Sequence, residues 1–283
     1  MGDTLKTTLR VVMCVVLGSV IGTLSYYEII NAAKLPVMED IRDLANNSRE
    51  LRISDQQSTL EKSRRSSVQV LSAAADNSLA AQSGTYVRIF GRYFVVTTSH
   101  GLLGDCNATK ILVDDELHNC VYFTEFNPHT DYAIIEVEKL PHRVPLQVPD
   151  DIPVGSDEWE KELSIMNRIF YTGYPNSVGP LTVDGYIAGY DGDDYIFLNS
   201  YAWSGSSGAG VFSQSGNYIG YVIAIDVGRT HYNTPQIIED VVLIVPAFKI
   251  NWESARHPPP IDTASPLLDV PETSDTANYS TVE

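Results

Sequence analysis

The chain has 283 residues, enough for one ordinary domain with appendages or for two small domains. Its formal net charge of −17 argues against nucleic-acid binding, because phosphate contacts need clustered Lys and Arg. The short basic run of Lys62, Arg64 and Arg65 is interpreted as part of a solvated linker.

Residues 11–27 form an uncharged, mostly apolar run, VVMCVVLGSVIGTLSYY, preceded by Lys6 and Arg10. A membrane-spanning helix needs about 17–25 apolar residues. Bulky residues close the run, so an uncleaved signal anchor is favoured over a cleaved signal peptide, and a buried core helix is the third alternative. The flanking charges lean towards a single-pass protein with the rest of the chain on the non-cytosolic side. We assign residues 1–33 to this anchor segment.

Residues 34–65 are predicted to form a polar helical stalk. Ser48 interrupts an approximate heptad seam in it. The seam consists of four apolar residues: Val37, Ile41, Leu44 and Leu51. The segment is interpreted as a solvated spacer, with self-association through the stalk as the alternative.

Residues 66–252 are predicted to form one all-β domain. Residues 66–83 are rich in small side chains and are interpreted as a joint, with an early strand at Val68–Leu71. Beyond them, short β-branched and aromatic runs are separated by Gly, Asn, Asp and Pro, as in a barrel or sandwich. The predicted strands are Tyr86–Phe90, Tyr93–Thr98, Ile111–Val113, Tyr132–Val137, Ile169–Thr172, Tyr195–Leu198, Gly210–Phe212, Tyr218–Ile225 and Val241–Val245.

Residues 253–283 are predicted to be a disordered acidic tail. Pro, Ser, Thr and acidic residues dominate the segment and no apolar period is present. Such a segment cannot bury enough surface to offset the entropy lost on ordering.

The chain has three cysteines, of which Cys14 lies in the apolar run. Cys106 and Cys120 either form a disulfide, in an oxidising compartment, or remain two separate buried thiols. No cysteine spacing indicates a zinc site. We expect neither a metal nor a cofactor.

Two residues at predicted strand ends have side chains suited to acid–base chemistry. His100 ends the strand in YFVVTTSHG, so its imidazole has a rigid backbone behind it and an open loop ahead, as a general base requires. Asp131 opens the strand in HTDYAIIEV, where a buried carboxylate can stay charged if a histidine donates to it. The ordinary alternatives are a structural histidine and an aspartate that caps a turn.

A glycine-rich segment, WSGSSGAGVF, surrounds Ser207. Glycines beside a serine allow the backbone to turn so that its N–H groups converge. The N–H groups of Gly205 and Ser207 would form an oxyanion hole, with the Ser207 hydroxyl as the nucleophile. Taken alone, the same motif is also common in ordinary turns.

The order of these motifs, His then Asp then Ser, resembles that of the trypsin-like serine peptidases. TTSHG is similar to the family's histidine motif, DYAIIEV to its aspartate motif and GSSGAGVF to its nucleophile motif. Residues 170–190 resemble the stretch before the active serine in Deg/HtrA-like and viral members. The resemblance implies two six-stranded antiparallel β-barrels and a serine endopeptidase that forms an acyl-enzyme. His100 would be its general base, Asp131 the orienting acid and Ser207 the nucleophile.

The same resemblance implies where a polypeptide substrate binds. Tyr201, six residues before Ser207, corresponds to a position near the base of the primary specificity pocket. No acid occupies that position, so we expect cleavage after a hydrophobic or medium-sized side chain rather than after Arg or Lys. One wall of the pocket is assigned to four residues: Val222, Ile223, Ala224 and Ile225.

The sequence also departs from the family pattern. Many members read GDSGGP, whereas this chain reads GSSGAG with Ser206 in place of the acid, and it has no IVGG-like motif. Activation by a new N-terminus is therefore not expected. The short spacing between the three motifs and the predicted membrane anchor before them resemble proteases of positive-strand RNA viruses. This resemblance favours polyprotein processing as the function. The alternative function is a catalytically silent protease-fold module whose tail, with the triproline Pro258–Pro260, binds a partner.

Overall fold

The computed structural model describes residues 56–192, 195–229 and 235–256, with backbone alone for residues 224–229 and 235–239. These residues belong to one of two compact units, Asp55–Glu283. The predicted anchor, most of the predicted stalk and the predicted tail beyond Arg256 lie outside the described residues and stay predictions. Residues 253–256, assigned to the disordered tail, are instead folded as part of a 3-10 helix with Ala255 buried, so the tail boundary was wrong. Within the described part, no helix has the length and apolar character needed to span a bilayer.

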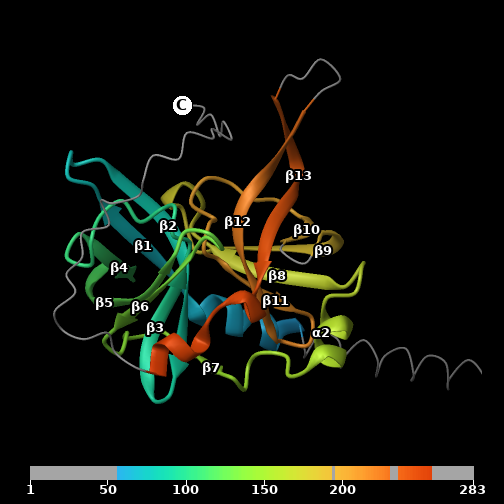
Figure 1. Ribbon diagram of the computed structural model, residues 1–283, viewed down its shortest axis with the longest axis horizontal. Coiled ribbons are helices and arrows are strands. Elements are labelled where there is room, and N and C mark those ends of the chain that lie inside the picture. Colours follow the sequence, from blue (N-terminus) through green and yellow to red (C-terminus); the bar gives the residue numbers. More distant parts are fainter. Residues whose placement is uncertain (1–55, 193–194, 230–234, 257–283) are drawn as a thin grey trace, which may run out of the picture. The chain divides into compact units, whose positions relative to one another are not determined.

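The first barrel is a closed ring of six antiparallel strands (Figure 1). Its strands are neighbours in the order β1-β4-β5-β6-β3-β2, and pairing of β1 with β2 closes the ring. A seventh strand, β7, pairs in parallel with β2. The strands are β1 (Ser67–Ala73), β2 (Leu79–Ile89), β3 (Arg92–Thr97), β4 (Thr109–Val113), β5 (Glu116–Asn127), β6 (Tyr132–Val137) and β7 (Leu146–Val148).

The second barrel is also a closed ring of six antiparallel strands, in the order β10-β13-β12-β11-β8-β9. Beyond the ring, β12 and β13 continue as a two-stranded hairpin (Figure 1). The strands are β8 (Arg168–Gly173), β9 (Leu181–Asp191), β10 (Tyr195–Asn199), β11 (Gly210–Ser213), β12 (Tyr218–Arg229) and β13 (Pro235–Pro246). The helices are α2 (Ser156–Glu162), η1 (Pro175–Ser177), η2 (Ala247–Lys249) and η3 (Trp252–Arg256). The predicted two-barrel architecture is confirmed.

Long apolar runs occur in the first barrel because several of its strands are buried on both faces. Side chains alternate between the faces of a strand. In β3, Val95 belongs to the core of the first barrel, whereas Phe94 and Val96 belong to a cluster shared by both barrels. In β6, Ile135 and Tyr132 divide in the same way. The second barrel contributes large aromatic side chains to this interbarrel cluster: Phe212, Tyr218 and Tyr221.

The strand prediction missed β5, β7 and β9. β5, ELHNCVYFTEFN, has no fully buried residue, and β9, LTVDGYIAGYD, is mostly exposed or half-buried, so neither shows a clear apolar run. β7 has three residues, too few for a pattern.

The interpretation of residues 66–83 as a joint was wrong, whereas the early strand predicted at Val68–Leu71 is confirmed as part of β1. The segment forms β1 and the beginning of β2, paired in a hairpin with Val70 opposite Gln82. Their small side chains fit a crowded place, since a Cβ added at the neighbouring Gly84 would lie 2.6 Å from Val95 Cγ1.

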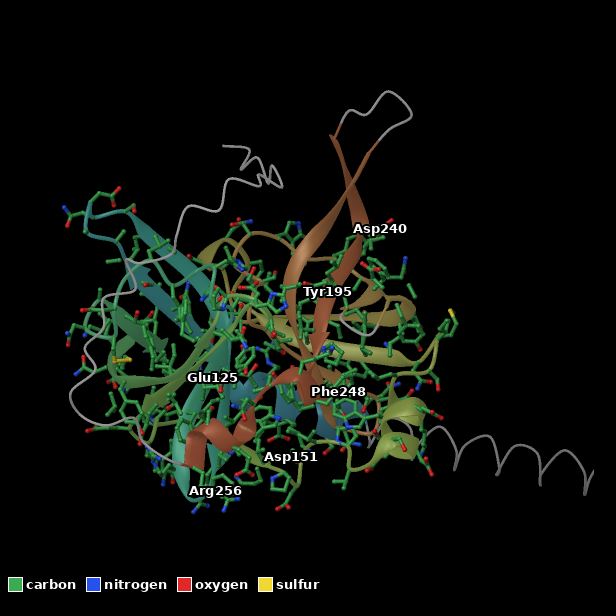
Figure 2. The ribbon with its side chains drawn as sticks, viewed as in Figure 1. Glu125, Asp151, Tyr195, Asp240, Phe248 and Arg256 are labelled. Carbon is green, nitrogen blue, oxygen red and sulfur yellow. A yellow bond between two sulfur atoms is a disulfide. The ribbon has the colours of Figure 1, made fainter. Side chains whose placement is uncertain are left out.

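Residues 56–66 are helical and contact the second barrel, although most of them fall in the predicted stalk. The buried Ser63 hydroxyl donates to Thr172 Oγ1 in β8 (2.8 Å). Lys62 Nζ forms an ion pair with Asp151 (2.8 Å) and donates to Gly216 O (3.0 Å). Asp151, labelled in Figure 2, lies between β7 and α2. Lys62 is therefore a contact residue of the domain and not part of a solvated linker.

Cys106 and Cys120 form a disulfide, which decides between the two alternatives left open by the sequence. The bond appears in yellow in Figure 2. It joins the loop that follows His100 to strand β5, with the two Cα atoms 5.3 Å apart. The loop between β3 and β4 is thereby anchored at its far end.

Candidate active site

His100 and Asp131 meet because their strands are paired. β3 and β6 are antiparallel with Thr97 opposite Ala133, so the end of one strand lies beside the start of the other. Asp131 Oδ2 accepts a hydrogen bond from His100 Nδ1 at 2.7 Å. An ionised carboxylate only accepts, so the ring carries its proton on Nδ1 and leaves Nε2 as an acceptor. The imidazole is half exposed and the carboxylate is mostly covered.

The second carboxylate oxygen of Asp131 is held by three donors. Oδ1 accepts from the backbone N–H of Ser99 (3.1 Å), the Ser99 hydroxyl (2.9 Å) and the backbone N–H of His100 (3.0 Å). Asp131 itself has φ +55°, a conformation that is uncommon outside glycine. The preceding turn is closed by Asn127 Oδ1, which accepts from Thr130 N–H (3.0 Å). Both oxygens of the carboxylate are therefore fixed in direction.

Ser207 lies in the connection between β10 and β11, and we call residues 203–209 the nucleophile loop. Two glycines with positive φ flank the serine: Gly205 at +90° and Gly208 at +83°. The Ser207 hydroxyl donates to the carbonyl oxygen of Ile223 at 3.2 Å. Within the described residues, no hydrogen bond joins Ser207 to His100. The structure thus pairs His100 with Asp131 and leaves the Ser207 hydroxyl directed at β12.

Among the backbone donors of the nucleophile loop, the N–H groups of Gly205 and Ser207 have no acceptor within the described residues. The carbonyl oxygens of Ser204 and Ser206 accept hydrogen bonds from other amides, at 2.6 and 3.0 Å. In a trans peptide the N–H points away from the carbonyl oxygen of the same unit. The N–H groups of Gly205 and Ser207 point away accordingly, and the described part of the chain supplies no partner for either. Unpaired donors beside a serine are what an oxyanion hole requires.

A family model described as "Trypsin-like peptidase domain" matches residues 82–220, which include His100, Asp131 and Ser207. Over these residues the chain is a member of the trypsin-like serine peptidase family. Its members are serine endopeptidases, so hydrolysis of peptide bonds is the activity that the family supports for this peptidase. Comparison with curated protein sequences gives no match.

Solved peptidase structures share the fold. The Rv3671c protease from M. tuberculosis, in its active form, has a TM-score of 0.52 at 16% identity, covering 71% of this chain and 86% of its own. The serine endoprotease from Yersinia pestis has a TM-score of 0.53 at 14% identity, covering 71% and 66%. The HtrA-type protease AlgW with a tripeptide has a TM-score of 0.51 at 15% identity, covering 68% and 59%. At these identities the likeness concerns the fold alone.

In this peptidase, the predicted pocket residue Tyr201 is well exposed and stacks on Trp203. The ring centroids are 6.4 Å apart, with an angle of 15° between the ring planes. The exposed fractions are 54% for Tyr201 and 46% for Trp203, large for aromatic side chains. Trp203 was not predicted from the sequence as a site residue, although a tryptophan so close to the nucleophile motif is a usable signal.

The predicted wall residues lie on β12 but differ in their surroundings. Val222 is buried in the core of the second barrel, and its N–H and carbonyl both make backbone hydrogen bonds. Ile223 is half-buried, and its carbonyl oxygen accepts from Ser207. The backbone of β12 continues through Ala224 and Ile225, whose side chains lie outside the description.

Ser206, which replaces the family's acid, closes a turn within the nucleophile loop. Its side chain is buried, and its Oγ accepts from the backbone N–H of Trp203 (3.2 Å). Its own N–H donates to the Trp203 carbonyl oxygen (2.8 Å). The turn is complete without an ionic partner for residue 206.

Proposed function

We propose that this peptidase cleaves polypeptides by acyl transfer, with Ser207 as the nucleophile, His100 as the general base and Asp131 as the orienting acid. The observation that supports the proposal is the 2.7 Å bond between His100 Nδ1 and Asp131 Oδ2. It leaves Nε2 to take the proton of the Ser207 hydroxyl as Oγ attacks the substrate carbonyl. The imidazolium then protonates the leaving amine, and water releases the acyl group by the same route.

The developing oxyanion is assigned to the unpaired N–H groups of Gly205 and Ser207. Before attack, the Ser207 hydroxyl has to leave Ile223 O, 3.2 Å away, and turn towards His100. This is a rotation about one side-chain bond between staggered positions. The described conformation is therefore interpreted as a resting form of the site.

The bond from Ser207 to Ile223 also favours the second candidate function, a catalytically silent module. In that case the nucleophile would stay paired with β12, and the protein would act by presenting its tail with Pro258–Pro260 to a partner. Retention of the His100–Asp131 pair supports the enzyme over this alternative, since a binding module has no need for an oriented imidazole.

The exposed pair of Tyr201 and Trp203 supports a preference for apolar side chains in the substrate. Large exposed aromatic surfaces beside a nucleophile provide contact area with little loss of side-chain entropy. The disulfide between Cys106 and Cys120 supports our proposal that the barrels lie outside the cytosol, because disulfides persist in oxidising compartments. Anchoring to a membrane through residues 1–33 stays a prediction. Polyprotein processing and self-association through the stalk stay predictions.

Replacement of Ser207 tests the chemistry. We expect Ser207→Ala to abolish both cleavage of an unfolded protein substrate and labelling by a fluorophosphonate. The matched control is Ser254→Ala in η3, which removes a hydroxyl that donates to Asn251 O just before the helix (2.8 Å) and should change neither readout. Cleavage that persists in Ser207→Ala contradicts the proposal. Absence of labelling in the unmodified protein, with retained partner binding through the tail, identifies the silent module.

Membrane topology is tested separately. Sealed vesicles with the cytosolic side outward should protect the β-barrels from an added protease. Complete digestion of the barrels under these conditions excludes the proposed orientation.

A further inference from the structure

Ser83 lies within β2 of the first barrel, with its side chain fully buried. Its N–H donates to the carbonyl oxygen of Ser207 (2.9 Å), and its hydroxyl donates to that of Gly205 (2.7 Å). The same hydroxyl accepts from the backbone N–H of Tyr174 (2.8 Å), and Ser83 O accepts from Thr97 Oγ1 (2.6 Å). One residue of the first barrel therefore holds two carbonyl groups of the nucleophile loop, which belongs to the second barrel.

Gly205 needs such support because glycine rotates easily. With no Cβ, it adopts positive and negative φ about equally well. The carbonyl oxygen before it, on Ser204, accepts from Asn176 N–H (2.6 Å), and its own carbonyl oxygen accepts from the Ser83 hydroxyl. The peptide units on both sides of Gly205 are thus tied to partners outside the loop. The Asn176 bond holds the peptide unit that contains the Gly205 N–H, and the Ser83 bond holds the next unit, so together they oppose rotation about Gly205.

The Ser83 hydroxyl also holds the segment that supplies the second bond. Tyr174 donates to Ser83 Oγ, and Asn176 follows two residues later in η1. The segment and the nucleophile loop are in close contact, because a Cβ added at Gly205 would lie 2.7 Å from Tyr174 O. A single buried hydroxyl thereby connects β2, η1 and the nucleophile loop.

We propose that Ser83 is a positioning residue for the oxyanion hole, a role that rests on the function proposed above. It acts through Gly205, whose N–H it holds towards the place where the oxyanion forms. Removing the hydroxyl leaves the buried Tyr174 N–H and the half-buried Gly205 O without a hydrogen-bond partner, which is unfavourable. The loop relieves this by rotating about Gly205, and the rotation moves the donor.

The test compares kcat, KM and the affinity for a peptide aldehyde, whose hemiacetal oxygen takes the oxyanion's place. For Ser83→Ala we expect kcat to fall about 10–100-fold, less than the loss of about 100–1,000-fold from removing an oxyanion donor outright. KM should change less than about threefold, and aldehyde affinity should fall with kcat. Ground-state binding is measured in proteins that cannot cleave the peptide. The Kd for the peptide should be similar in Ser207→Ala and in the double variant Ser83→Ala/Ser207→Ala.

The matched control is Ser67→Ala. Ser67 is also buried, and its hydroxyl also crosses between barrels, donating to Thr172 O (2.8 Å) without contacting the nucleophile loop. We expect Ser67→Ala to lower the Tm about as much as Ser83→Ala does, but to leave kcat and the affinity for the aldehyde unchanged. Ser83→Cys, which keeps a weaker donor and acceptor at this position, should have intermediate activity. If Ser83→Ala does not fold, the activity of Ser83→Cys tests the positioning role instead.

Two results overturn the positioning role: kcat and aldehyde affinity retained in Ser83→Ala, or lost equally in Ser67→Ala. If folding of Ser83→Ala fails, full activity in Ser83→Cys despite loss of the strong donor overturns it as well. Failure of the unmodified protein to react with a fluorophosphonate is a different result, because it removes the proposed function itself and this inference with it.

Discussion

The phenol of Tyr221, on β12 of the second barrel, donates a hydrogen bond to the carbonyl oxygen of Thr130 in the first barrel, 2.8 Å away. Thr130 immediately precedes Asp131, so the bond ties the orienting carboxylate to the opposite barrel. The Tyr221 ring also packs edge-on against Tyr132, with centroids 6.4 Å apart. Ser99, the neighbour of His100, therefore holds the Asp131 carboxylate, and Tyr221 of the other barrel holds the backbone immediately before Asp131.

Tyr221→Phe should loosen this arrangement. It removes the donor to Thr130 and keeps the ring, so we expect a loss of about 1–2 kcal/mol in the free energy of unfolding. We expect kcat to fall about threefold to tenfold, because the turn before Asp131 gains freedom. Urea unfolding and steady-state kinetics measure the two effects. Tyr86→Phe is the control: its buried hydroxyl accepts from Leu140 N–H (3.1 Å) far from this turn, and kcat should not change. Equal losses of kcat in both variants contradict the prediction.

Asp131→Asn and Ser99→Ala should separate the effect of the Asp131 charge from the effect of fixing its carboxylate in position. The asparagine loses the charge that stabilises the imidazolium and misdirects the tautomer, so we expect kcat to fall about 1,000–10,000-fold. Ser99→Ala removes one of three donors to Oδ1 and leaves the bond to His100, so a decrease of about tenfold or less is expected. Single-turnover kinetics measures both rates. A loss for Ser99→Ala as large as that for Asp131→Asn would assign Ser99 a larger role than orientation.

Gly208→Ala should be poorly tolerated for a steric reason. Gly208 has φ +83°, and an added Cβ would lie 2.1 Å from the carbonyl oxygen of Ser83, a backbone atom that cannot move aside. We expect loss of soluble folded protein or destabilisation of several kcal/mol. Gly91→Ala is the control, with φ +84° and no atom within 4 Å of the added Cβ, so it carries only the backbone strain of about 1–2 kcal/mol. Similar Tm values for the two variants would refute the steric explanation.

Alkaline pH should destabilise the fold through buried phenols. Burial raises the pKa of the Tyr132 phenol to about 12, above its ordinary value of about 10. Between these values the unfolded chain releases the proton and the folded chain keeps it. The free energy of unfolding therefore decreases as pH rises from about 10 to about 12, by at most about 1.4 kcal/mol per pH unit for this group. Tyr132→Phe should show a shallower decrease in chemical unfolding over that range. Parallel curves for the two proteins would rule out this contribution.

Loss of the disulfide should lower stability. Cys106 and Cys120 are 14 residues apart, and a loop of about that length corresponds to about 3 kcal/mol of stabilisation in the chain-entropy account. We expect Cys106→Ser/Cys120→Ser to melt at a lower temperature than the oxidised protein, as measured by calorimetry. Adding dithiothreitol should lower the Tm of the unmodified protein and leave that of the double variant unchanged. An unchanged Tm after confirmed reduction would show that the bond does not contribute to stability.

The strands that could be predicted from the sequence are those with buried runs. β3 and β6 lie between their own barrel's core and the interbarrel cluster, so nearly every residue in them is apolar. β5 has no buried residue and β9 has only two, and their sequences mix Glu, Asn, Asp and Gly with apolar residues. Residues 66–83 misled the prediction because small side chains mark both flexible joints and crowded strand pairs.

The candidate site divides in a similar way. His100, Asp131 and Ser207 stand in motifs that are contiguous in the chain, and the glycines beside Ser207 reveal a turn through their chemistry alone. Ser83 and Ser99 carry no such signal. The hydroxyl of each forms a hydrogen bond with a residue more than thirty positions away in the chain. A buried serine, in strand β2 for Ser83 or just after β3 for Ser99, has no sequence pattern of its own.

The amino-acid sequence alone determined that this chain contains an all-β domain, and its motifs established the resemblance to serine peptidases with a histidine, an aspartate and a serine in that order. Those properties reside in local composition and in short motifs. Only the tertiary structure decided which oxygen of Asp131 faces His100, that the Ser207 hydroxyl rests on Ile223, and that Cys106 bonds Cys120. Hydrogen bonds and disulfides form between atoms a few ångströms apart, and it is the closure of the two barrels that brings such distant residues within that range.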